Sequence, residues 1–124
     1  MQATRDFFAG LGCLVYALVK ADGNIDDSEL KSYGHAMLEG FGDWVMSSTG
    51  QRALASFEMM NSAGKTPEEA YKEAMRYFLL DKHELRRFRD KILEVLKDVA
   101  ASDEKIDETE LDILERFERE TLDL

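Results

Sequence analysis

The sequence predicts an all-α fold, a single compact bundle of six to seven helices. Three observations lead to this fold class. Apolar residues recur at three- and four-residue spacings along almost the whole chain, which is the period of a helix with one buried face. The chain contains one proline and eight glycines, and it lacks runs of β-branched residues. With 44% hydrophobic residues over 124 positions, it is expected to form one domain with its own core, spanning residues 1–124.

The N-terminal half is expected to hold three helices. The first covers about residues 4–20, carries a broad apolar face and ends before Gly23. The second begins at Asp26 and ends at the glycine-rich break of residues 40–42. Residues 43–48 are expected to form a short helical turn, and a third helix covers about residues 51–62.

The C-terminal half is expected to hold three more helices. Thr66 can cap a helix that begins with Pro67, because Glu69 stands where it can close a capping box, and this helix runs to about residue 80. Asp81 can cap the next helix, whose apolar positions continue at helical spacing to about residue 101. Asp107 begins the last helix, whose expected inward positions are Leu111, Leu114, Phe117 and Leu122.

The charge of the chain excludes some partners. A net charge of −10 would repel a phosphate backbone, so nucleic acid is not an expected partner. Residues 98–124 hold eleven acidic and three basic side chains and carry most of the excess negative charge of the chain. The basic cluster of Arg86, Arg87, Arg89 and Lys91 is expected to be a solvated helix face that pairs with this acidic segment, and an anion site is the alternative.

The single cysteine and the lengths of the apolar runs indicate where in the cell the protein is expected. Cys13 cannot form an internal disulfide and lies in an apolar stretch, which favours a small buried thiol and a reducing environment. The longest apolar run is much shorter than the roughly 20 residues that a membrane-spanning helix needs. No transmembrane segment and a cytoplasmic location are therefore expected.

Catalysis is not expected, because no pattern assembles a nucleophile and a base. His35 and His83 are not at zinc-site spacing, and neither belongs to a metalloprotease-type helix. Each is expected to be a surface or packing histidine.

One nine-residue phrase occurs twice. Residues 22–30, the first repeat, read Asp-Gly-Asn-Ile-Asp-Asp-Ser-Glu-Leu, and residues 103–111, the second repeat, read Asp-Glu-Lys-Ile-Asp-Glu-Thr-Glu-Leu. Both occur at a junction between two predicted helices, which indicates a pseudo-two-fold internal repeat. If the two helix junctions meet, four to six carboxylates come together, and converging carboxylates favour the binding of a cation.

Two readings of the repeats follow from local chemistry. In the structural reading, Asp26 and Asp107 are N-caps and Glu29 and Glu110 close capping boxes, so no ligand is needed. Asp22 and Asp103 have no such capping role. In the second reading each repeat is the latter half of an EF-hand calcium loop, but the earlier ligand positions hold only aliphatic residues and a lysine. These positions are Leu18, Lys20, Val99 and Ala101.

A third reading is a family resemblance. The segment Ala21–Ile25 followed by Glu29, echoed by Asp103, Ile106 and Glu110, resembles the TerB-like domain of tellurite-resistance TerB and the DjlA N-terminus. The second repeat departs from the pattern, since Ser102 and Glu104 stand where the first has Ala21 and Gly23. The resemblance implies a non-enzymatic, all-helical stress-response or scaffold domain with an acidic patch that binds a divalent metal.

Transferred to this sequence, the resemblance implies a set of metal ligands. The main candidates are Asp22, Glu29, Asp103 and Glu110, and the secondary candidates are Asp26 and Asp107. Because all are oxygen donors, Ca²⁺, Mg²⁺ or Mn²⁺ is favoured over Zn²⁺. The alternative function is a metal-independent, co-chaperone-like interaction module, whose acidic face or Met-rich segment docks a basic or amphipathic partner protein. The Met-rich segment comprises Met37, Met46, Met59 and Met60.

Overall fold

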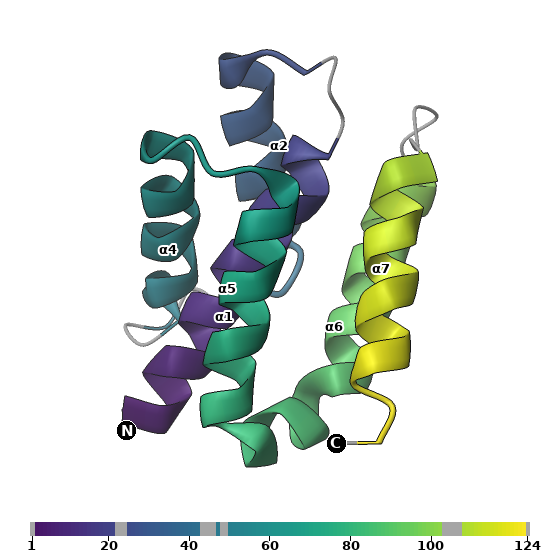
Figure 1. Cartoon of the computed structure of the whole chain (residues 1–124). Coiled ribbons are helices and arrows are strands. Elements are labelled where there is room, and N and C mark those ends of the chain that lie inside the picture. The colour runs from purple at the N-terminus through teal and green to yellow at the C-terminus, as the bar shows by residue number, and fades with distance from the viewer. Residues whose placement is uncertain (1, 22–24, 43–46, 48–49, 103–107, 124) are drawn as a thin grey trace.

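The all-α prediction is confirmed. The computed structural model describes residues 2–21, 25–42, 47, 50–102 and 108–123, and every regular element in these ranges is a helix (Figure 1). The helices are α1 (Gln2–Lys20), α2 (Asp27–Glu39), α4 (Gln51–Ser62), α5 (Pro67–Leu80), α6 (Lys82–Ser102) and α7 (Glu108–Glu120). The turn predicted over residues 43–48 lies mostly outside the described residues. The pseudo-two-fold relation between the halves stays a prediction.

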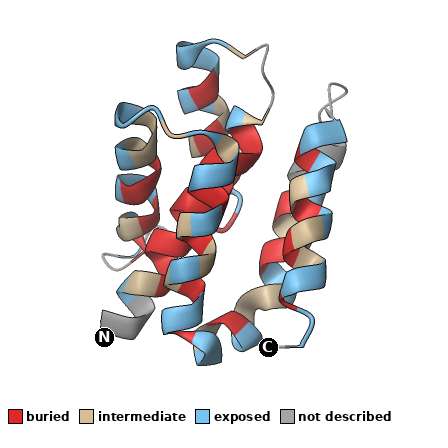
Figure 2. Ribbon diagram, in the orientation of Figure 1, coloured by how far each residue is buried: buried red, intermediate tan, exposed pale blue. Residues whose placement is uncertain are grey.

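Helix α1 is the core of the bundle. Every residue from Phe7 to Val19 is buried, around the whole circumference of the helix (Figure 2). A helix that is apolar on all sides must be enclosed by other helices. Accordingly, α1 contacts α2, α4, α5, α6 and α7. Cys13 is fully buried as predicted, and burial raises the pKa of its thiol to about 11.

Small residues let α4 approach the backbone of α1 closely. Gly12 faces Ala53 and Ser56 of α4 with no room for a side chain between them. The Ser56 hydroxyl donates a hydrogen bond to the carbonyl oxygen of Ala9 at 2.8 Å, which satisfies a buried polar group inside the contact. One turn further along α1, the Tyr16 hydroxyl donates to the carbonyl oxygen of Lys65 at 2.7 Å and fixes the entry into α5.

Aromatic rings join three helices. The ring of Phe78 on α5 lies 5.4 Å from that of Phe7 on α1 and 5.7 Å from that of Phe117 on α7, measured between centroids. Tilted ring pairs at such distances add to the free energy gained by burial. Phe78 therefore ties α7 to the central helix.

Two predicted helix starts are confirmed. Thr66 and Glu69 form a reciprocal capping box at the start of α5, with donor–acceptor distances of 3.1 and 3.0 Å. Asp81 accepts a long hydrogen bond of 3.4 Å from the backbone N–H of Glu84 at the start of α6. Asp81 is buried, and its second carboxylate oxygen has no hydrogen-bond partner among the described residues.

One residue of the predicted basic cluster, Arg89, contacts the acidic C-terminal segment, through a hydroxyl group and a backbone carbonyl group. Its guanidinium donates to the Thr121 hydroxyl at 2.8 Å and to the Glu118 carbonyl oxygen at 2.7 Å. Lys97 adds an ion pair with Glu118 at 2.7 Å. None of the helices in the described part of the chain combines the length and hydrophobicity needed to cross a bilayer.

Two inward positions predicted for the last helix are wrong. Leu111 is 41% exposed and Leu122 is 68% exposed. The inward face of α7 instead carries Glu110, Leu114 and Phe117, which recur at four- and three-residue steps. Leu114 and Phe117 are buried as predicted, and Glu110 shares their face because it stands about two helical turns before Phe117, whereas Leu111 is rotated away from that face.

Candidate functional site

Residues that adjoin or belong to the two repeats meet at one end of the bundle. Ala21 immediately precedes the first repeat, and Thr109 belongs to the second. The Thr109 hydroxyl donates a hydrogen bond to the carbonyl oxygen of Ala21 at 3.0 Å, across 88 residues of sequence. Figure 1 shows the end of α1 and the start of α7 at the same, upper end of the molecule. The region around this contact is called the joint below.

Three of the six candidate ligands lie within the described residues. Asp26 is the N-cap of α2, where its Oδ1 accepts from the backbone N–H of Glu29 at 2.8 Å. This hydrogen bond lowers the pKa of Asp26. Asp26 and Glu29 are both exposed. The capping role of Asp26 is thus confirmed, while Asp22, Asp103 and Asp107 lie outside the described residues.

Glu110 is the candidate ligand whose surroundings differ most from expectation. It is only 4% exposed and shares the inward face of α7 with Leu114. A carboxylate is stable in such a position only with polar or charged neighbours. This burial could not be predicted from the sequence pattern, because the adjacent Leu111 is more apolar than Glu110 and was expected to face inward.

The described candidates do not make a metal site by themselves. Within the described ranges, no group of three or more His, Cys, Asp or Glu side chains is arranged to hold a metal ion. Asp26 and Glu29 offer exposed oxygen donors, a chemistry that suits Ca²⁺, Mg²⁺ or Mn²⁺. A complete donor set at the joint would therefore have to include Asp22, Asp103 or Asp107.

A groove opens beside the joint, between the end of α1 and the starts of α5 and α7. It has a volume of about 340 Å³. Its lining consists of Ala21, Thr66, Pro67, Glu68, Tyr71, Thr109, Asp112 and Ile113. Ala21 and Thr109 thus belong both to the groove and to the contact that defines the joint. We call this feature the joint groove.

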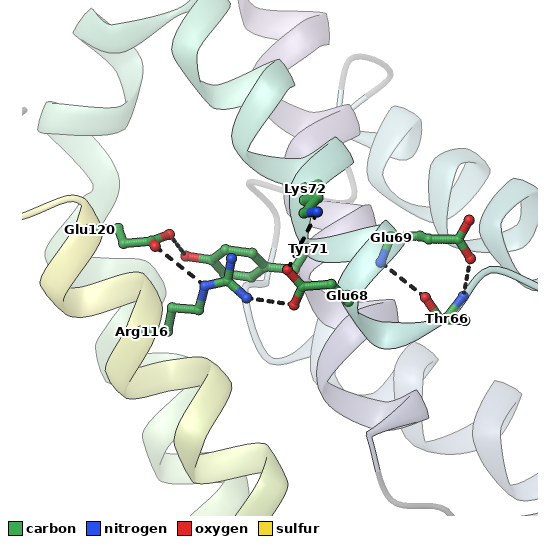
Figure 3. Close-up of polar contacts among 7 residues, drawn as sticks. All are labelled: Thr66, Glu68, Glu69, Tyr71, Lys72, Arg116 and Glu120. Carbon is green, nitrogen blue, oxygen red and sulfur yellow. Dashed lines mark hydrogen bonds and ion pairs between the residues drawn. The ribbon is translucent and has the colours of Figure 1, made fainter.

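A polar cluster borders the joint groove (Figure 3). The guanidinium of Arg116 donates to Glu68 at 2.6 Å and to Glu120 at 3.3 Å, and it lies 4.2 Å from the centroid of the Tyr71 ring. The Tyr71 hydroxyl donates to Glu120 at 2.6 Å. The cluster links α5 to α7 and so fixes two walls of the groove relative to each other.

The cluster shifts the pKa values of its members. The hydrogen bond from Arg116 lowers the pKa of Glu68. The hydrogen bond from Tyr71 is the first cause of the lowered pKa of Glu120, and burial is the first cause of the raised pKa of Tyr71. The sequence could show Arg116 and Glu120 as an i,i+4 pair, but it gave no signal for contacts across helices.

The pKa shifts predict a pH dependence of stability. A carboxylate whose pKa is lowered on folding stabilises the fold above its unfolded pKa of about 4.3, and this contribution is lost as the pH falls through the folded pKa. We expect Arg116→Gln to reduce stability at pH 7 and to flatten the fall in stability between pH 5 and pH 3. Urea unfolding at several pH values measures both effects.

The matched control is Arg86→Gln, which removes the same charge from an exposed position on α6. This control should keep the slope of the unmodified protein. Equal slopes for the two variants would contradict the contribution of the cluster.

The described residues of the joint offer the chemistry of binding. They supply carboxylate oxygens, hydroxyl groups and an apolar wall within one open groove. A comparison with protein-family models, curated proteins and solved structures found no match.

Proposed function

We propose that this protein is a TerB-like, non-enzymatic stress-response or scaffold domain of the cytoplasm that binds a divalent cation at the joint. The hydrogen bond between Thr109 and Ala21 carries the proposal, since it brings the second repeat against the residue before the first. The proposed ligands are carboxylates of both repeats, drawn from Asp22, Asp26, Glu29, Asp103, Asp107 and Glu110.

Physical chemistry supports a hard cation in this place. The net charge of the chain is −10, so each carboxylate added to the joint raises the electrostatic free energy, and a divalent cation offsets that repulsion. Asp26 uses Oδ1 for capping, and the lone pairs of its second carboxylate oxygen can coordinate a metal ion. Glu29 follows three residues later, on the same side of the first turn of α2.

The test is a melting-temperature titration with Ca²⁺, Mg²⁺ and Mn²⁺. With a Kd on the order of 1 mM, 10 mM cation would raise the melting temperature by about 5 °C, because only the folded protein binds it. EDTA should reverse the shift. Asp22→Asn/Asp103→Asn should abolish it.

The control variant is Glu94→Gln/Glu115→Gln, which also removes two negative charges, from exposed positions on α6 and α7. It should keep the full response to the cation. If the unmodified protein does not respond to any of the three cations, or if the Asp22/Asp103 variant responds in full, the proposed site is wrong.

The second candidate function is a metal-independent interaction module that docks a basic or amphipathic partner protein. The observation that favours it is the joint groove, which combines an apolar wall with acidic residues at its rim. The Met-rich segment supports it less, because Met37 is buried and Met60 is half-buried against the core. The joint groove is therefore the preferred docking surface.

A further inference from the structure

The joint groove has two kinds of lining. Ala21, Pro67, Ile113 and the ring of Tyr71 provide an apolar wall. Of these residues, Tyr71 is almost completely buried, and Pro67 and Ile113 are half-buried. A volume of about 340 Å³ lies at the lower end of the range for sites that bind small ligands or single side chains.

The charged groups of the lining have one sign. Glu68 and Asp112 are its two ionisable side chains apart from the buried Tyr71, and both are exposed. Arg116 contacts Glu68 but is shared with Glu120, so one guanidinium faces two carboxylates. Lys72 lies 3.9 Å from Glu68 and is itself mostly exposed, which makes that ion pair weak.

The wider surroundings strengthen the same sign. One wall of the groove is α7, which belongs to the segment of residues 98–124 with eleven acidic and three basic side chains. A cationic group that approaches the groove is therefore attracted both by the rim and by the whole helix behind it.

We infer that the joint groove binds a peptide segment of a partner protein that carries a lysine or arginine beside a leucine-like apolar residue. This inference rests on the second candidate function and names its site and ligand chemistry. Lysine and arginine have an apolar stem and a charged head, so the stem can lie along Pro67 and Ile113 while the head reaches Asp112. The neighbouring apolar residue of the peptide covers the rest of the wall.

The test uses fluorescein-labelled peptides of repeated Leu-Lys-Lys-Leu sequence and fluorescence anisotropy in EDTA. Binding should be saturable and should weaken as salt rises from 50 to 300 mM. Peptides with every lysine replaced by glutamate, or every leucine by serine, should bind at least about tenfold more weakly. Gel filtration of the unliganded protein shows whether a second copy of the chain occupies the groove instead.

The variants separate the groove from general attraction by an acidic protein. Asp112→Asn should weaken peptide binding about threefold and Asp112→Lys about tenfold, whereas Lys72→Gln should strengthen it. Asp90→Lys, at a fully exposed carboxylate of α6, makes the same charge reversal away from the groove and should change the affinity by less than about twofold.

Equal weakening by Asp112→Lys and Asp90→Lys would overturn the inference, and so would equal binding of the leucine and serine peptides. A stable dimer that excludes the peptide would also overturn it. Failure of the cation proposal is distinguishable, because peptide binding is measured in EDTA and the melting response of Asp112→Lys to cations is measured without peptide.

Discussion

Gly12→Ala is expected to destabilise the protein by about 3 kcal/mol, although alanine is the better helix former by about 1 kcal/mol. An added Cβ would overlap the carbonyl group of Ala53 and the hydroxyl oxygen of Ser56. The first of these is backbone, so relief requires α4 to move away from α1. Since both helices are close-packed in the core, that movement opens cavities elsewhere. Urea unfolding followed by circular dichroism measures the loss.

Two further variants define this prediction. Ser56→Ala in the Gly12→Ala background should not restore stability, because the contact with the Ala53 carbonyl remains. Gly40→Ala is the matched control, as its backbone is right-handed helical and the nearest atoms to an added Cβ lie at 3.1 and 3.3 Å. Its effect should stay within about 1 kcal/mol. Restoration by Ser56→Ala, or equal effects at both glycines, would contradict the packing argument.

Phe78→Ala should cost about 3 to 5 kcal/mol, the range for removing a buried phenylalanine. Phe78 is fully buried and contacts rings on α1 and α7, so its loss leaves a cavity where three helices meet. The substitution should also weaken the packing of α7 against the core. Hydrogen exchange at the amides of α7 is expected to accelerate more than exchange in α4, which does not share this contact.

The neighbouring Leu79→Ala is the control, because Leu79 is 46% exposed on the same helix. It should change the free energy of unfolding by less than about 1 kcal/mol. Comparable losses for the two variants, or equal acceleration of exchange in α4 and α7, would show that Phe78 does not hold α7 to the core.

The limits of the helices could be predicted because their signals are local. The capping box of Thr66 and Glu69 and the N-cap Asp26 depend on residues within one turn, so the sequence contains all the required chemistry. The burial of Glu110 in place of Leu111 on α7 was not predicted in this way. Leu114 and Phe117 were predicted to face inward and are buried, but side-chain polarity favours Leu111 for the remaining inward position, whereas helical spacing from Phe117 favours Glu110.

The candidate site was predictable in part. The repeats indicated which carboxylates to consider, and the capping role of Asp26 followed from its position. The joint groove and the cluster of Arg116 with Glu68 and Tyr71 were not predictable, because they combine α5 and α7, whose relative placement is set by packing. In the sequence, Thr109 showed only that it occupies the position of Ser28 in the first repeat, and its hydrogen bond to Ala21 could not be predicted.

The enclosed position of α1 has a consequence for biosynthesis. The ribosome makes this helix before every element that covers it, and Phe78, which belongs to the same core on the α5 side, stands 59 positions after Val19. At about 5 to 20 residues per second, translation of that interval takes roughly 3 to 12 seconds. During that interval only α2 and α4 can cover α1, so protection of its remaining apolar surface from aggregation must come from the translation machinery or from transient collapse.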